Sequence, residues 1–131
     1  MSNARRATAI AVGATVLLGL GALPAHAENY RDTNFSGWTR GTESSRWHDN
    51  DRDNTTTALT FADCYTDAGF SYATLKVWRD VPLSPDVDRG TRTNYCGTSL
   101  WGKEAQGDYY FELDGFLSGS VMTVKSIRIK W

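Results

Sequence analysis

The feature that most restricts the fold is the alternation of apolar and polar residues from Thr55 to the C-terminus. It is clearest between residues 70 and 81, where one face of an extended chain carries Ala73, Leu75 and Val77. A period of two is the period of a β-strand. No stretch of this region has the 3.6-residue period of an amphipathic helix. We therefore expect an all-β fold, a small antiparallel sandwich or barrel with an extended N-terminal arm.

Other short apolar runs separated by turn residues extend this prediction. Strands are expected up to Cys64 and over 91–96, 109–113 and 121–131, with a loop through 82–90 and a tight turn at Asp114-Gly115. In the last run the apolar positions change phase near Lys125-Ser126. A β-bulge there would keep all of them on one face.

The first 27 residues have the pattern of a secretion signal. Arg5 and Arg6 precede an uncharged run over 7–23, and Pro24 and the triplet Ala25-His26-Ala27 follow. A membrane anchor would need about 20 strongly apolar residues, whereas this run is shorter and contains three glycines. We expect cleavage after Ala27 and a secreted, extracellular protein.

Cys64 and Cys96 are the only cysteines. In an exported chain, paired thiols are the default, so we expect one disulfide. The alternatives are a reactive thiol or a metal pair, but neither cysteine has the neighbouring Cys or His that a zinc site needs.

The charge balance argues against a nucleic-acid partner. Cleavage removes Arg5 and Arg6, which leaves 12 basic and 15 acidic residues and a net charge of −3. Nucleic-acid binding needs a basic footprint, and anionic membrane surfaces are disfavoured for the same reason.

Residues 28–54 differ in composition from the β-domain expected over 55–131. The segment is polar, has almost no aliphatic residues, and contains Tyr30, Phe35, Trp38 and Trp47. We interpret it as an arm, loosely held or in part an edge strand, whose four aromatic side chains bind a partner. Deleting 28–46 should then leave a folded body. The alternative is that the aromatic side chains cover one end of the sheet.

Metal or hydrolytic chemistry has little support in the sequence. Carboxylates alternate in Asp49-Asn50-Asp51-Arg52-Asp53, as in a calcium loop, but the glycine and terminal glutamate of that motif are missing. We expect weak or no calcium binding, no metal site and no cofactor. A catalytic triad would have to use His48, which the sequence leaves unoriented. Glu112 with Asp108 or Asp114 could serve glycoside hydrolysis, although acidic residues beside glycine more often form turns.

The chain resembles the small adaptor subunits of secreted umbrella toxin particles. The resemblance lies in gross design: a leader ending Ala25-His26-Ala27, the aromatic segment 28–54, and a single Cys64–Cys96 bridge in a β-rich body. The resemblance assigns no functional residue to this chain. It implies extracellular protein partners, namely a lectin-like subunit and a larger toxin subunit.

The sequence favours a secreted, non-enzymatic binding or adaptor protein with no catalytic residue. Five tryptophans and six tyrosines also leave open a small carbohydrate-binding module or lectin, because exposed aromatic rings suit sugar as well as protein surfaces. A small secreted hydrolase or toxin is the third alternative. For Trp78, Phe111 and Trp131 we expect a core position.

Overall fold

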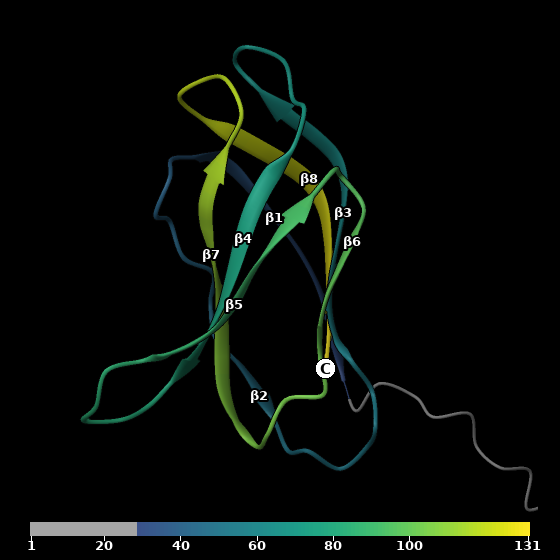
Figure 1. Ribbon diagram of the computed structural model, residues 1–131. Coiled ribbons are helices and arrows are strands. Elements are labelled where there is room, and N and C mark those ends of the chain that lie inside the picture. The colour runs from purple at the N-terminus through teal and green to yellow at the C-terminus, as the bar shows by residue number, and fades with distance from the viewer. Residues whose placement is uncertain (1–28) are drawn as a thin grey trace, which may run out of the picture.

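Two antiparallel sheets of four strands face each other in the computed structural model, which describes residues 29–131 (Figure 1). The first sheet has the order β1-β8-β3-β6 and the second β2-β7-β4-β5. The strands are β1 (Tyr30–Trp38), β2 (Trp47–Asp49), β3 (Thr57–Thr66), β4 (Ala73–Asp80), β5 (Val87–Asn94), β6 (Thr98–Gly102), β7 (Gly107–Phe116) and β8 (Met122–Lys130). The all-β prediction is confirmed. The predicted signal, 1–27, lies outside the described residues.

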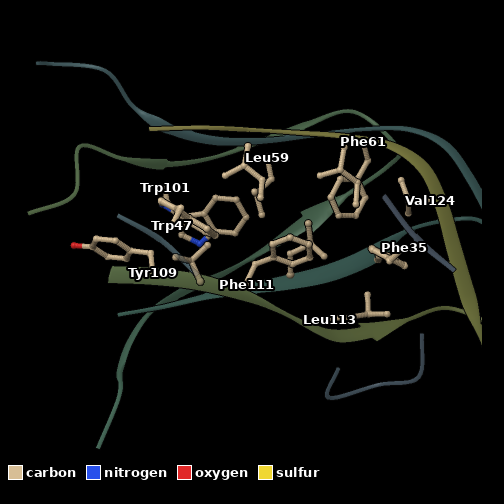
Figure 2. Close-up of a cluster of buried hydrophobic side chains, with 14 of the residues drawn as sticks. Phe35, Trp47, Leu59, Phe61, Trp101, Tyr109, Phe111, Leu113 and Val124 are labelled. Carbon is tan, nitrogen blue, oxygen red and sulfur yellow. The ribbon is translucent and has the colours of Figure 1, made fainter. Parts of the chain in front are cut away.

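The core lies between the sheets (Figure 2). The alternation that predicted β4 is confirmed, because Ala73, Leu75 and Val77 are all fully buried. They share this layer with Phe61 of β3 and Phe111 of β7, whose ring centroids are 6.0 Å apart. The strands that form the core therefore turn alternate side chains inward, as the period of two requires.

The predicted β-bulge in the last strand is confirmed. Against β1, the partner of Thr33 is Ile127 and that of Phe35 is Val124. One residue of β1 thus opposes two of β8, Lys125 and Ser126, and both are exposed. The extra residue returns the apolar side chains after it to the inner face, so that apolar residues on either side of the bulge are buried.

Three local predictions differ from the structure. Asp114-Gly115 is not a tight turn but part of β7, with a register irregularity opposite Thr74. The strand β6 was not expected, although Ser99 and Trp101 are its buried alternate residues. The strand β5 begins within the predicted loop 82–90. At Asp114-Gly115, pairing of β7 with the distant strand β4 overrides a local turn signal.

Residues 30–49 form strands at the edges of both sheets, so the expected edge strand is confirmed but a loosely held arm is not seen. The strand β1 pairs with β8, and β2 pairs with β7. Phe35 is buried and stacks on Trp38, with ring centroids 4.1 Å apart. Trp47 is buried beside Tyr109.

A shift in the register of β1 accommodates the irregular spacing of Phe35 and Trp38. The register of β1 shifts between Phe35 and Trp38, where Gly37 adopts a φ of 65°. Only glycine enters that region without steric cost. The shift lets two aromatic residues three positions apart share the inner face, so they are not presented on a flexible chain as the sequence suggested.

The predicted disulfide is present. Cys64 on β3 is bonded to Cys96 in the turn between β5 and β6. Among residues 29–131, no helix is long and apolar enough to span a membrane.

Candidate functional site

An open groove with a volume of about 510 Å³ crosses the outer face of the first sheet. Its floor consists of side chains that point away from the core on three adjacent strands. The lining residues are Asp32, Thr33, Asn34, Thr60, Ala62, Lys125, Ser126 and Arg128. Hydroxyl, amide, carboxylate and cationic groups therefore occupy one continuous surface.

The bulge in β8 helps to shape this groove. Two consecutive side chains, Lys125 and Ser126, are exposed and line it, where a regular strand would turn one of them inward. They lie opposite the stretch of β1 that contains Asn34. Bulges commonly re-aim side chains beside functional sites.

Asp32 and Arg128 form a bidentate ion pair across β1 and β8. The Nε and Nη2 atoms of Arg128 donate to the two carboxylate oxygens of Asp32 at 2.7 and 2.8 Å. Hydrogen bonding to Arg128 lowers the pKa of Asp32. The pair fixes two planar polar groups in the floor, with both side chains more than half exposed.

Two tyrosine rings lie beside the cationic residues of the groove. The guanidinium of Arg128 lies over the ring of Tyr30, 4.7 Å from its centroid, and Nζ of Lys125 lies 5.0 Å from that of Tyr65. Both tyrosines are about half exposed. Their partners on β8 are Lys130 and Thr123, so the backbones of the two tyrosines are about 23 Å apart along the strand direction at 3.3 Å per residue.

His48 is held in place, contrary to the expectation from the sequence. Its Nδ1 lies 2.7 Å from Oδ1 of Asp108, across the pairing of β2 with β7. Hydrogen bonding to Asp108 raises the pKa of His48. The pair lies on the second sheet and does not line the groove.

The acidic segment 49–54 is hydrogen-bonded within the protein. Oδ1 of Asp49 accepts from the backbone N–H of Asp51, and Oδ1 of Asp53 accepts from that of Thr55, both at 2.8 Å. Nζ of Lys103 lies 3.3 Å from Oδ1 of Asp51. Over the described part of the chain, no three His, Cys, Asp or Glu side chains are grouped to hold a metal ion. Weak or absent calcium binding stays a prediction.

None of the four predicted partner-binding residues lines the groove, although the ring of Tyr30 contacts its lining residue Arg128. Phe35 and Trp47 belong to the core, and Trp38 packs against it. Asp32, Asn34 and Arg128 were not predicted from the sequence as site residues. Asp32 and Asn34 do alternate on β1, a signal that would have placed them on one face of a strand.

No protein-family model, curated protein or solved structure matches the chain.

Proposed function

We propose that this chain is a secreted, non-enzymatic binding protein whose groove on the first sheet binds a saccharide chain. The observation that carries the proposal is the polar floor between two half-exposed tyrosines, Tyr30 and Tyr65. Sugar rings present an apolar face and a rim of hydroxyl groups. An aromatic ring can cover the first, while the floor supplies hydrogen-bond partners for the second.

The dimensions and chemistry of the groove support a chain rather than a single small molecule. A separation of about 23 Å along the strands between the backbones of the two tyrosines fits a chain of several linked sugar units lying over the first sheet. The floor offers both donors and acceptors, including the Asp32–Arg128 pair. Small-molecule pockets, by contrast, are concave and mostly apolar.

Secretion is supported by the leader pattern in 1–27 and by the Cys64–Cys96 disulfide, which is typical of oxidising compartments. The adaptor role implied by the umbrella-toxin resemblance stays a second candidate. A specific observation favours it, a fully exposed leucine at the tip of the β4–β5 hairpin.

Affinity electrophoresis tests the proposal. The mature protein is run through native gels that contain one of a panel of soluble polysaccharides, neutral and acidic, and a binding polymer retards it. Tyr65→Ala should weaken binding to that polymer at least tenfold, because it removes one stacking surface. Tyr95→Ala is the matched control, since Tyr95 is more exposed and its ring packs against Tyr72, whereas the ring of Tyr65 contacts the groove residue Lys125.

Three outcomes would count against saccharide binding in the groove. They are the absence of retardation by every polymer, equal losses for Tyr65→Ala and Tyr95→Ala, and unchanged affinity after Arg128→Ala. Release of reducing ends from a retarding polymer by the wild-type protein would contradict the non-enzymatic part of the proposal.

A further inference from the structure

The charged side chains that line the groove do not balance one another. They comprise one carboxylate, Asp32, and two cations, Lys125 and Arg128, which leaves a net charge of +1. Arg128 binds both oxygens of Asp32, so these two charges already compensate each other. The remaining charge of the groove is the ammonium group of Lys125.

Lys125 has no carboxylate partner in the part of the chain that the structure describes. The ion pairs among residues 29–131 include neither Lys125 nor Asp63, the acidic residue opposite it in the pairing of β3 with β8. The side chain of Lys125 is also exposed. A cation that lines a groove without a direct counter-charge complements an anionic group on a ligand.

The same ammonium covers one of the rings on which the proposed saccharide stacks. Nζ of Lys125 lies over the ring of Tyr65, 5.0 Å from its centroid. The two residues are diagonal neighbours on the sheet, because the partner of Tyr65 on β8 is Thr123. A sugar that takes this face of the ring must therefore displace the ammonium and end its cation–π contact.

We propose that Lys125 makes the groove selective for acidic saccharides, by binding the carboxylate of a uronic acid unit that stacks on Tyr65. This inference rests on the saccharide-binding function proposed above. An acidic sugar gives the displaced ammonium an ion pair in place of the cation–π contact. A neutral sugar takes the ring and offers no such replacement. The carboxylate of a uronic acid is attached to the sugar ring itself, so it lies at the edge of the stacked unit, beside the displaced ammonium.

The groups around Lys125 suit the rest of such a unit. Ser126 follows it in the bulge, and both side chains line the groove because the bulge leaves both of them exposed. Asn34 lines the groove from β1. The hydroxyl and the amide can each donate and accept, as the hydroxyl groups of a sugar require.

Affinity electrophoresis with matched polymers tests the selectivity. Polygalacturonate, alginate and hyaluronate are each compared with their own methyl esters, which keep the backbone and lose the charge. At least one acidic polymer should bind the wild-type protein about three- to fivefold more tightly than its ester does, the range for an exposed ion pair. Sodium chloride at about 0.5 M should remove most of this difference, because it screens exposed charges.

The variant Lys125→Gln identifies the residue responsible. It should bind the acidic polymer about three- to fivefold more weakly and the ester equally well or better, because the ring of Tyr65 is then uncovered. Lys103→Gln is the matched control, an equal change of charge in the connection between β6 and β7, where Nζ of Lys103 donates to Oδ1 of Asn54.

Three results would overturn the selectivity while leaving saccharide binding in place. They are esters that bind as tightly as the acids, a Lys125→Gln protein that loses both forms equally or neither, and an equal loss for Lys103→Gln. Retardation by neutral polymers alone has the same meaning. The absence of retardation by every acidic and neutral polymer would overturn both this inference and the proposed function.

Discussion

Asp67 shows how a single exposed carboxylate can join two loops. Its Oδ1 accepts from the backbone N–H groups of Ser120 and Val121 at 2.7 and 3.2 Å, and its Oδ2 accepts from the Ser120 hydroxyl at 2.6 Å. These hydrogen bonds lower the pKa of Asp67 to about 2. They connect the turn after β3 to the loop between β7 and β8.

Asp67→Asn should lower the thermal midpoint at pH 7, because the amide replaces a charged acceptor. The folded-state pKa is depressed, so this stabilisation is full above the ordinary value of 3.8 and is lost as the pH falls towards 2. Calorimetry between pH 7 and pH 2 should show the gap between wild type and variant closing. Asp63→Asn, an equal charge change on β3, is the control. A gap that persists at pH 2 would show that the carboxylate charge is not its cause.

His48 should titrate with a pKa above its ordinary 6.5, because hydrogen bonding to Asp108 favours the charged imidazolium. A raised folded-state pKa stabilises the protein below pH 6.5, and this contribution is lost as the pH rises through the folded-state value. An NMR titration of the imidazole measures this pKa directly. Asp108→Asn should bring it down towards 6.5, and an unchanged value would exclude Asp108 as the cause.

At the scale of elements, β1 is an integral part of the sandwich. It pairs with β8 along most of its length and contributes Phe35 to the core. Deletion of 28–46 should therefore unfold the protein, whereas the sequence had suggested a stable remainder. Phe35→Ala alone should cost about 3–5 kcal/mol of unfolding free energy, the usual loss for a buried phenylalanine. Urea denaturation measures both, with Tyr30→Ala on the same strand as a control that should change stability little.

The elements that could be predicted from the sequence are those with a clean local period. Alternation revealed β4, and the change of phase near Lys125 revealed the bulge in β8. The strand β1 was harder to see because it has almost no aliphatic residues and its aromatic positions are offset at Gly37. The groove could not be predicted, because it depends on β1 pairing with β8 across most of the chain, a contact that no local pattern encodes.

At the scale of the whole molecule, the sandwich separates two chemically different surfaces. The groove on the outer face of the first sheet is lined by polar and charged side chains, while the connection between β4 and β5, in the second sheet, exposes Leu83. A saccharide bound in the groove, as we propose, would leave the connection between β4 and β5 uncovered.

The Cys64–Cys96 disulfide links the two sheets through the connection between β5 and β6. The loop that it closes, with a sequence separation of 32, contains all of β4 and β5. In the chain-entropy model, closing a loop of this size stabilises the fold by about 3–4 kcal/mol. Replacing both cysteines by alanine should lower the unfolding free energy by about that amount, measured by urea denaturation. Wild-type protein kept reduced is the control and should lose a similar amount. A loss below about 1 kcal/mol would show that the bridge is not a main source of stability. Residual contacts in the unfolded chain would then hold β3 near the β5–β6 turn even without the bridge.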